Sequence, residues 1–485
     1  MKIHFVGVAG TGMGSAAGLM VANGHDVSGS DTHFHPPIGD TLPRWGVRTM
    51  EGFQPGNLDP APDLVVIGNV CRATNPEARA AIDRGLPYLS LPGLLEQEVL
   101  AHRRNLVVAG THGKTTSTAL LAWLLSEAGA DPGFMVGGLP RNFDRSFAIG
   151  HDGGPFVIEG DEYDSAFFEK KPKFWRYHPH AALLTSVEFD HIDIYPDEAS
   201  YDAAFQGFLE RMEPGAVLVA YAGDPGVRKI ARQSSVRTVY YGLDGDDCGD
   251  VTPTWFAAKA PIRGGLCPFD LFVGGSSLGR AQSPLMGDHN LRNVVGSIAL
   301  LSEAGISDPT SLMRALPAFA GVRRRQERIG EAGGVTVYDD FAHHPTAIRE
   351  TLRGFRDQIG ARGPGAGRLI ALFEPRSATA SRRVHQEQYP DAFQSADTIL
   401  LAPVGRPEIA PEERIDTDRI ASTLRARGKS AHAEPDLDRL VDRACAEARP
   451  GDIIVAMSNG DFGGIHDRIL AALALKGISR RTAPV

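Results

Sequence analysis

The segment from 105 to 125 has the residue types, in the right order, to bind the phosphates of a nucleotide. The apolar run Leu106–Ala109 is typical of a buried parallel strand. The turn Gly110-Thr111-His112-Gly113 follows, and Lys114-Thr115-Thr116 then opens a segment with apolar residues at helical spacing. In such a unit, backbone N–H groups hold phosphate oxygens, the lysine reaches terminal phosphates and a hydroxyl holds Mg²⁺. The spacing is compact, since Val108 stands where the first glycine usually lies, and an ordinary glycine-rich turn is the alternative.

Two further apolar runs end in residues that suit a metal ion. The run from Phe156 leads into four acids: Glu159, Asp161, Glu162 and Asp164. Carboxylate oxygens at a strand end beside a phosphate loop suit Mg²⁺, and a solvated acidic turn is the alternative. The run from Ala182 to Val187 leads into a second polar group: Glu188, Asp190, His191 and Asp193. His191 is expected either to ligate a second metal ion or to form a pH-sensitive hydrogen-bonded pair.

A glycine-rich loop near the N-terminus predicts a second nucleotide-type site. Residues 2–6 read as a first strand, the loop from Gly7 to Ser15 leads into a helix, and residues 26–31 read as a second strand that ends in an acid. Glycines let the backbone approach a diphosphate, and an acid about 20 residues on can bind a ribose hydroxyl. The ligand could be NAD(H) or a UDP-sugar, and an empty tight turn is the alternative. A third strand, 63–68, ends at Asn69.

The second half of the chain contains further polar motifs. His289 and Asn290 stand at a predicted helix start, where they can bind a purine or where the asparagine can cap the helix. Arg325 ends a basic triplet that is either a solvated face or a contact to a transferred phosphate. The segment from Val335 to Pro345 reads as a strand that ends in acids and histidines, among them His343 and His344. Adjacent residues on a strand point to opposite faces, so we expect polar contacts here rather than a zinc site.

Composition indicates a cytoplasmic enzyme built from two to four α/β domains. The chain has 485 residues, is 42% hydrophobic and 22% charged, and alternates apolar strands with amphipathic helices. A net charge of -9 disfavours a nucleic-acid partner. The four cysteines are scattered, which fits a reducing compartment and excludes a zinc ribbon. We find no apolar run of about 18 residues and no signal peptide, and therefore expect no membrane partner.

The order of these motifs resembles the Mur ligases, which join an amino acid or peptide to a UDP-muramic acid precursor of peptidoglycan. The motifs run from the glycine fingerprint through Gly-Thr-His-Gly-Lys-Thr-Thr, Glu-x-x-Glu, Asp-His-x-Asp, Gly-x-His-Asn and an inter-domain arginine to Asp-Asp-x-x-His-His-Pro. The resemblance covers essentially the whole chain. It implies a Rossmann-like UDP-sugar domain at 1–98, a P-loop ATPase domain with a mostly parallel sheet at 99–321, and a Rossmann-like acceptor domain at 322–485.

The resemblance also implies roles for single residues. Lys114 would stabilise the β- and γ-phosphates of ATP, and Arg325 would reach the transferred phosphate. Thr115 and Glu162 would hold one Mg²⁺ and His191 a second. His289, Asn290 and Asn293 would lie at the adenine and Asp340 at the ribose. The residues implied for the UDP-sugar are Gly10, Thr11, Gly12, Asp31 and Asn69.

The acceptor is less directly indicated. Stretches that include Phe341-Ala-His-His-Pro-Thr, Glu374-Pro-Arg376-Ser377 and Ser458-Asn459 resemble the family members whose acceptor is the recycled tripeptide L-alanyl-γ-D-glutamyl-meso-diaminopimelate. Members that add L-alanine to UDP-N-acetylmuramate typically have a histidine in place of Arg376, and remain the alternative. An arginine suits an acceptor with extra carboxylates. The implied role is in peptidoglycan synthesis and recycling, and through the cell wall in cell shape, cell cycle and cell division.

Two positions depart from the family pattern. Ser186 stands where an asparagine is common, and Gln206 stands where several relatives have a carbamylated lysine. The second Mg²⁺ would then be held without a carbamate. Two other classes stay open on the residues alone: a nicotinamide-dependent oxidoreductase, which leaves the Lys-Thr loop unexplained, and a P-loop switch that needs no amine acceptor. No obligate protein partner is indicated.

Overall fold

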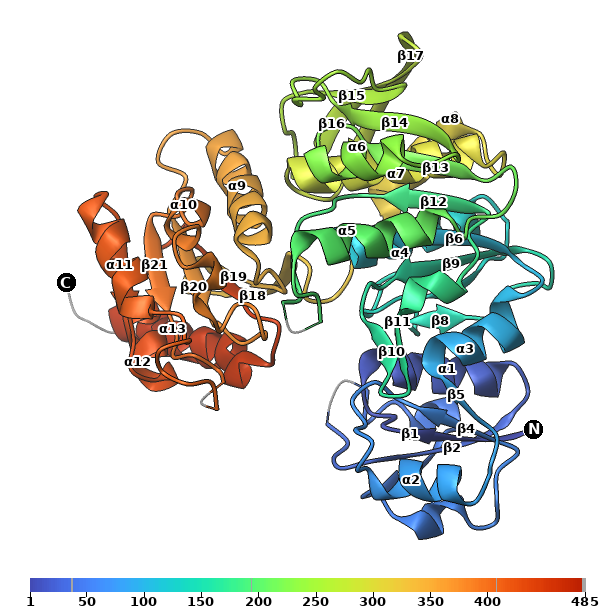
Figure 1. The fold of residues 1–485 in the computed structure, drawn as a ribbon. Coiled ribbons are helices and arrows are strands. Elements are labelled where there is room, and N and C mark those ends of the chain that lie inside the picture. The colour runs from blue at the N-terminus through green and yellow to red at the C-terminus, as the bar shows by residue number, and fades with distance from the viewer. Residues whose placement is uncertain (36–37, 193, 407, 482–485) are drawn as a thin grey trace.

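Three sheets with their own helices follow one another along the chain (Figure 1). The computed structural model describes residues 1–35, 38–192, 194–406 and 408–481. We call the parts built on these three sheets, in chain order, the N-terminal, middle and C-terminal bodies. The α/β class expected from the sequence is confirmed, whereas domain boundaries at 98/99 and 321/322 stay predictions. Among the described residues, no helix is long and apolar enough to cross a membrane.

The N-terminal body is built on a five-stranded, wholly parallel sheet. In sheet order the strands are β3 (Arg48–Glu51), β2 (Asp26–Asp31), β1 (Lys2–Val6), β4 (Leu64–Ile67) and β5 (Tyr88–Ser90). Its helices are α1 (Thr11–Ala22), α2 (Pro76–Asp83) and α3 (Leu91–Leu95). Helix α1 consists largely of small and apolar residues, and its central part, residues 13–20, is buried.

The middle body has a ten-stranded sheet in which the seven central strands run parallel. In sheet order the strands are β17 (Ser276–Ser283), β16 (Cys267–Val273), β15 (Trp255–Lys259), β14 (Arg237–Leu243), β13 (Val217–Tyr221), β12 (Ala181–Leu184), β6 (Arg104–Ala109), β9 (Pro155–Gly160), β7 (Gly133–Met135) and β8 (Phe147–Ala148). Strands β8, β16 and β17 are antiparallel to their neighbours. A separate hairpin pairs β10 (Asp164–Ala166) with β11 (Glu169–Pro172).

Both faces of this sheet are covered, which explains the continuous apolar runs in its sequence. Leu106 and Val108 of β6 belong to one core, shared with helices α4 (Lys114–Glu127) and α7 (Asp288–Glu303). Val107 and Ala109 belong to the opposite core, shared with α5 (Glu198–Leu209) and α6 (Pro225–Arg232). Helix α8 (Pro309–Ala315) packs beside α7. The run expected to extend to Val187 ends as a strand at Leu184.

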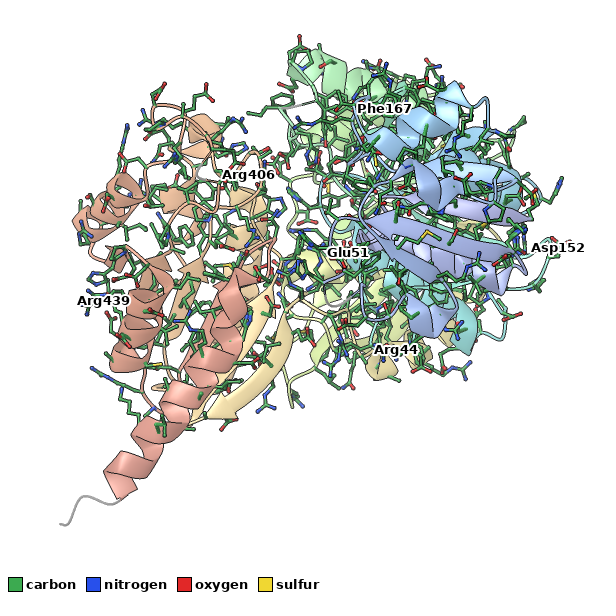
Figure 2. All side chains as sticks on the ribbon, turned by 90° about the horizontal axis from the view of Figure 1, so that it is seen from below. Arg44, Glu51, Asp152, Phe167, Arg406 and Arg439 are labelled. Atoms are coloured by element: carbon green, nitrogen blue, oxygen red, sulfur yellow. The ribbon has the colours of Figure 1, made fainter. Side chains whose placement is uncertain are left out.

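The C-terminal body has a six-stranded sheet with helices on both faces. Its strands, in sheet order, are β18 (Glu327–Ala332), β19 (Val335–Asp340), β23 (Ile453–Met457), β20 (Leu369–Phe373), β21 (Thr398–Leu401) and β22 (Ser430–Ala433). Only β18 is antiparallel to its neighbour. The helices are α9 (Pro345–Ala361), α10 (Tyr389–Ala392), α11 (Thr417–Ala426), α12 (Leu437–Glu447) and α13 (Ile465–Arg481). Figure 2 shows Arg439 of α12 on the side of this body that lies away from the N-terminal body.

The N-terminal and C-terminal bodies both contact the middle body. The N-terminal body packs an apolar surface on the middle body: Trp45 stacks edge-on against Phe147 with ring centroids 4.9 Å apart, and a Cβ on Gly18 would clash with the same ring. The C-terminal body makes polar contacts, such as Thr379 Oγ1 to Asp190 Oδ1 at 2.9 Å, and its core also includes Met286 of the middle body. Polar interfaces within a chain are typical of domains that move relative to one another.

Candidate active site

A cavity of about 1200 Å³ lies where strands of the middle and C-terminal sheets end. Its walls include the loops that follow β6, β9, β12 and β19, together with Thr11 and Gly12 at the start of α1. Ligands of open α/β sheets bind outside the carboxyl ends of the strands. The position of this cavity therefore agrees with the strand-end motifs of the sequence.

The phosphate loop needs both of its glycines. Gly110 has φ 135° and Gly113 has φ 84°, backbone conformations that L side chains rarely adopt. A Cβ at Gly113 would also lie 2.5 Å from Asn293 Oδ1, and one at Gly110 would lie 2.3 Å from Thr185 Oγ1. The loop thus brings α7 and the β12 end against the start of α4. His112, Lys114, Thr115 and Thr116 line the cavity with Thr111 and Gly113.

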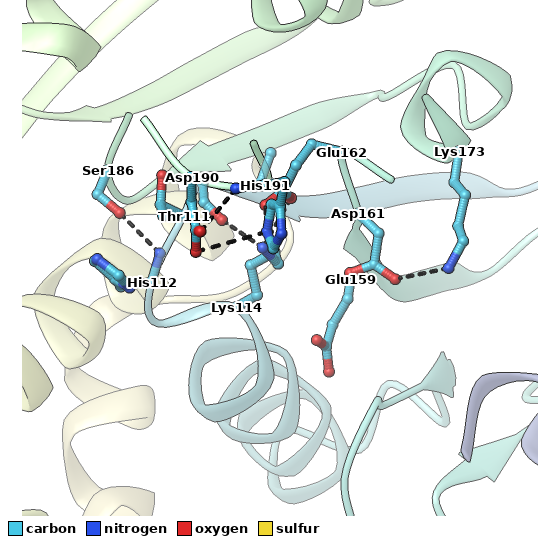
Figure 3. A network of polar contacts seen from close by, with 12 residues as sticks. Thr111, His112, Lys114, Glu159, Asp161, Glu162, Lys173, Ser186, Asp190 and His191 are labelled. Atoms are coloured by element: carbon cyan, nitrogen blue, oxygen red, sulfur yellow. Dashed lines mark hydrogen bonds and ion pairs between the residues drawn. The ribbon is translucent and has the colours of Figure 1, made fainter. Parts of the chain in front are cut away.

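Lys114 is held by an ion pair inside the cavity wall (Figure 3). Its Nζ donates to Glu162 Oε2 at 2.9 Å and to the carbonyl oxygen of Gly110 at 2.7 Å. Burial opposes the ammonium charge, but the carboxylates of Glu162, Asp161 and Glu159 outweigh it and raise the pKa of Lys114. The ammonium is therefore present at neutral pH and lies beside the loop that would hold phosphates.

Glu162 joins this lysine to His191. Its side chain has no exposed surface, and its Oε1 lies 3.1 Å from His191 Nε2. Burial opposes the carboxylate charge, but Lys114 and His191 lower the pKa of Glu162 to about 2. Burial also opposes charge on His191, but the bond to Glu162 and the charge of Asp190 raise the pKa of this histidine. The structure therefore brings Lys114, Glu162 and His191 into one network.

Glu159 is a cavity residue that the sequence placed among the four acids suited to Mg²⁺ but did not single out as a metal ligand. Its Oε2 accepts a hydrogen bond from Thr115 Oγ1 at 3.0 Å, and its Oε1 accepts one from the Gly137 N–H at 2.5 Å. Burial, with Asp161 nearby, raises the pKa of Glu159 to about 7. Parallel pairing of β9 with β6 sets Glu159 opposite Val108, just before the phosphate loop. The signal that could have identified this contact is the register between β9 and β6, which can be derived only when the strand order is known.

The C-terminal body contributes Arg325 to the phosphate loop. Arg325 Nη2 donates to Thr115 Oγ1 at 3.3 Å, and its guanidinium lies 4.8 Å from the centre of the Phe341 ring. Arg323 of the same triplet is exposed, and Arg324 pairs with Asp339 at 3.2 Å. The triplet is therefore not a uniform solvated face, because its third arginine crosses to the middle body.

The residues expected at a purine lie at the start of α7. Gly287 is the N-cap of this helix, so Asn290 does not serve as its cap. Asn290 Nδ2 donates to the carbonyl oxygen of Met286 at 2.9 Å and to Gln326 Oε1 at 3.1 Å. Burial lowers the pKa of His289 to about 4, so its imidazole is neutral. Asn293 Nδ2 donates to Asn290 Oδ1 at 3.3 Å.

Two of the expected sugar-binding acids are engaged by the backbone. Asp340 lines the cavity, but its Oδ1 and Oδ2 accept N–H bonds from Ala342 and Gln326, both at 2.8 Å. Asp31 accepts N–H bonds from Ala9 and Thr32 at 2.8 and 2.7 Å, so it shapes the first glycine loop.

The remaining predicted positions lie outside the cavity wall. Gly10, Asp31 and Asn69 are not among the lining residues, and Gly10 and Asn69 are exposed. Three further residues, expected at the acceptor, lie in the C-terminal body away from the cavity: Arg376, Ser377 and Asn459. Arg376 Nη1 donates to Asp461 Oδ1 at 2.9 Å. Ser377 Oγ accepts the Ala380 N–H at 3.0 Å. The buried Oδ1 of Asn459 has no partner among the described residues.

The expectation for the two adjacent histidines was built on the wrong local structure. Strand β19 ends at Asp340, so His343 lies in the following loop and His344 is the N-cap of α9. They are therefore not on opposite faces of a strand. His344 instead faces His112 of the phosphate loop, with ring centroids 5.0 Å apart. Asp193, which the sequence placed in the acidic group around His191, lies outside the described residues.

The helices that begin at the predicted ligand sites share one feature. Helices α1, α4 and α7 begin at Gly10, Gly113 and Gly287, and in each case no side chain caps the helix. By contrast, α5, α6, α11 and α12 each have an aspartate whose side chain accepts an N–H bond at the N-terminus. The uncapped N–H groups of α1 and α4 can donate hydrogen bonds to an anion. A diphosphate or a triphosphate could therefore bind at these helix starts.

Three family models match the chain in succession. Residues 2–103 match the model described as Mur ligase family, catalytic domain. Residues 108–301 match the Mur ligase middle domain, and residues 324–460 match the model described as Mur ligase, glutamate ligase domain. These three ranges correspond to the three bodies of the fold.

Curated relatives and solved structures match over nearly the full length. The chain is 38% identical over 478 residues to the UDP-N-acetylmuramate–L-alanyl-gamma-D-glutamyl-meso-2,6-diaminoheptandioate ligase of Escherichia coli, covering 98% of this chain and 99% of the relative. It is 32% identical over 490 residues to a UDP-N-acetylmuramate–L-alanine ligase of a Roseiflexus species, covering 98% and 99%. A murein peptide ligase structure from Psychrobacter arcticus superposes with a TM-score of 0.71 at 34% identity, covering 98% of this chain and 99% of that one.

Proposed function

The chain belongs to the Mur ligase family, and we propose that it joins UDP-N-acetylmuramate to the tripeptide L-alanyl-γ-D-glutamyl-meso-diaminopimelate, with hydrolysis of ATP to ADP and phosphate. The observation that carries the ligase chemistry is the network of Lys114, Glu162 and His191 beside the phosphate loop, with Arg325 reaching it from the C-terminal body. The tripeptide acceptor is supported by the 38% identity to a relative that is named for it.

The chemistry follows from the poor reactivity of a carboxylate toward an amine. A lactyl carboxylate oxygen of UDP-N-acetylmuramate attacks the γ-phosphorus of ATP, and the bond to ADP breaks. The α-amine of the tripeptide then attacks the acyl carbon, loses a proton, and expels phosphate with the former carboxylate oxygen. Each step transfers or releases a highly charged phosphoryl group, so the protein acts mainly by positioning and charge stabilisation.

The cavity residues suit this work. Lys114 would exchange its contact with Glu162 for the terminal phosphates of ATP, since its Nζ already lies at the loop. Arg325 would contact the transferred phosphate from the opposite side, where it now donates to Thr115 Oγ1. The loop N–H groups from Gly110 to Thr116 would hold the remaining phosphate oxygens. His289, Asn290, Asn293 and Asp340 would receive the nucleoside.

The donor set around the loop fits Mg²⁺. Thr115 offers a hydroxyl oxygen, Glu162 a carboxylate and His191 an imidazole, while Glu159 adds a carboxylate bonded to Thr115. Bound there, Mg²⁺ would neutralise charge on the phosphates. Glu159 gives the chain an additional oxygen donor beside Thr115. We therefore assign Thr115, Glu162 and His191 to metal binding, with Glu159 as a supporting residue.

The two substrates would approach from the other bodies. We assign the UDP end of the donor to the N-terminal glycine loop, Gly10 to Gly12, with Asp31 shaping it and Asn69 at the neighbouring strand end. We assign the acceptor carboxylates to Arg376, Ser377 and Asn459 of the C-terminal body. Because these residues lie away from the cavity wall, the C-terminal body must move to bring acceptor and acyl phosphate together. Such closure would also exclude water from the acyl phosphate.

The second candidate is ligation of L-alanine, which the 32% identical Roseiflexus relative is named for. One assay separates the two: purified protein with ATP, Mg²⁺ and UDP-N-acetylmuramate is given either the tripeptide or L-alanine. With the tripeptide, we expect phosphate release and a product whose mass shows that the tripeptide has been added. With L-alanine, we expect little turnover. Efficient ligation of L-alanine alone would overturn the tripeptide assignment. Because ATP and UDP-linked sugars are cytoplasmic metabolites, we place the reaction in the cytoplasm, within peptidoglycan recycling.

A further inference from the structure

Three side chains outside the Lys114–Glu162–His191 network meet at the boundary between the middle and C-terminal bodies. They are His112 of the phosphate loop, Glu188 after β12, and His344 at the start of α9. His112 Nε2 lies 3.0 Å from Glu188 Oε2, and His344 Nδ1 lies 3.8 Å from the same oxygen. One ligand atom from each residue lies within 4.8 Å of the other two. Three segments that are far apart in sequence thus converge on one point.

The groups are also held in place by the surrounding structure. Glu188 Oε1 accepts a hydrogen bond from Thr346 Oγ1 at 2.7 Å, which leaves Oε2 directed at the two histidines. The side chain of His344 is only 2% exposed and packs edge-on against the His385 ring at 4.6 Å. Its Nδ1 receives a 3.4 Å contact from the Thr346 N–H, longer than an ordinary hydrogen bond. Its buried Nε2 has no partner among the described residues. Because the nitrogen that faces Glu188 is Nδ1, a metal ion there would displace the long Thr346 contact, and Nε2 would carry the ring proton.

We propose that His112, Glu188 and His344 form a binding site for a single transition-metal ion of the Zn²⁺ class. Two imidazole nitrogens and one carboxylate oxygen match the three-protein-ligand, tetrahedral arrangement in which water takes the fourth position. The same set disfavours Mg²⁺, which prefers oxygen ligands in octahedral geometry. The site is therefore distinct in chemistry from the Thr115, Glu162 and His191 set.

An ion at this position would connect two bodies. His112 and Glu188 belong to the middle body, and His344 begins the first helix of the C-terminal body. The ion would supplement the polar contacts between these bodies, of which Thr346 to Glu188 is one. It would thereby tie the start of α9 to the phosphate loop and fix the side chain of His112 there.

The test measures the binding of Zn²⁺ to the full-length protein by isothermal titration calorimetry in the presence of excess Mg²⁺. His344→Asn removes the imidazole but keeps an amide oxygen able to cap α9, and Glu188→Gln keeps the acceptor for Thr346. His343→Asn is the matched control, because His343 is adjacent in sequence but does not belong to the cluster. We expect one Zn²⁺ per chain in the wild type and the control, and an affinity at least about tenfold weaker in the two site variants.

Anomalous diffraction at the zinc edge, from crystals of the wild type with Zn²⁺ and Mg²⁺, gives an independent location. The proposal predicts a peak with ligand distances of about 2.0–2.2 Å to the two imidazoles and Glu188. A peak only at Glu162 and His191, or equal Zn²⁺ affinity in wild type, His344→Asn and Glu188→Gln, would overturn it. Thermal unfolding of both variants without Zn²⁺ shows whether a loss of Zn²⁺ affinity results from a loss of folding. A variant that is folded and binds Zn²⁺ with unchanged affinity counts against the site.

Discussion

Lys114 and Glu162 form an ion pair of 2.9 Å in which the carboxylate has no exposed surface. This pair links the phosphate loop to the acids that follow β9, and His191 extends it on the far side of the carboxylate. Lys114 and Glu162 thus neutralise each other until a triphosphate and its cation provide new partners. The pair therefore holds the site in a form ready for both ligands.

Replacing Lys114 tests this relationship. Lys114→Met should lower kcat/KM by at least about a hundredfold, because the charge next to the developing phosphoryl charge is lost. Lys170→Met is a suitable control, since Lys170 is 65% exposed and pairs with Asp164 away from the loop. Steady-state phosphate release measures both. Near-normal ligation by Lys114→Met would exclude the phosphate role of this lysine.

Arg325 should act in the transition state more than in nucleotide binding. Arg325→Lys keeps the charge but loses the planar fork that reaches Thr115 Oγ1 across the bodies. We expect kcat to fall by about 10²- to 10³-fold with KM for ATP changed only a few-fold. Arg328→Lys, at a 55% exposed position that does not line the cavity, should leave both constants within about twofold. Equal effects of the two substitutions would contradict the assignment of Arg325.

A buried network in the N-terminal body predicts a stability effect. Glu77 is fully buried: its Oε1 contacts His4 Nε2 at 2.5 Å and accepts from Ser30, and its Oε2 accepts from the Gln54 N–H and Asn57. Glu77→Ala leaves these partners unsatisfied and should cost about 3–5 kcal/mol. Glu51→Ala, at a 77% exposed position, should be close to neutral. Urea unfolding followed by far-UV circular dichroism measures the difference, and similar midpoints for both variants would contradict it.

His289 predicts a specific pH dependence. Burial lowers its pKa to about 4 from an ordinary value of 6.5, so the folded state disfavours its protonation. Its contribution to stability is complete above about pH 6.5 and is lost as the pH falls toward 4, by up to about 3 kcal/mol. Urea unfolding of wild type and His289→Asn, from pH 7 to 4, should show a steeper loss for the wild type. Parallel curves would mean that His289 titrates normally in the folded protein.

The sequence predicted the local parts of the site because these depend on neighbours in the chain. The phosphate loop and the acids at the β9 and β12 ends are strand–loop motifs, and the structure places them at one sheet edge. Which acid pairs with Lys114 depends on the order of strands, and the sequence alone did not show the contact between Glu159 and Thr115. Parallel pairing of β6 with both β9 and β12 provides that information.

Some of the predicted site residues also bind the backbone. Asp31 and Asp340, which were expected at ribose hydroxyls, both accept N–H bonds of nearby loops, and their roles toward a ribose stay predictions. The pair His343 and His344 was judged as part of a strand, whereas the chain turns after Asp340 and uses His344 as a helix cap. Side-chain bonds to nearby backbone depend on loop geometry, which periodicity does not encode.

The central claim, that this site makes an acyl phosphate, is tested most directly by isotope transfer. UDP-N-acetylmuramate with ¹⁸O in its lactyl carboxylate is ligated to the tripeptide with unlabelled ATP, and the released phosphate is analysed by mass spectrometry. Attack of the carboxylate on the γ-phosphorus predicts that one ¹⁸O enters each phosphate and the other stays in the amide. Phosphate free of ¹⁸O, with product formed at the normal rate, would contradict the mechanism.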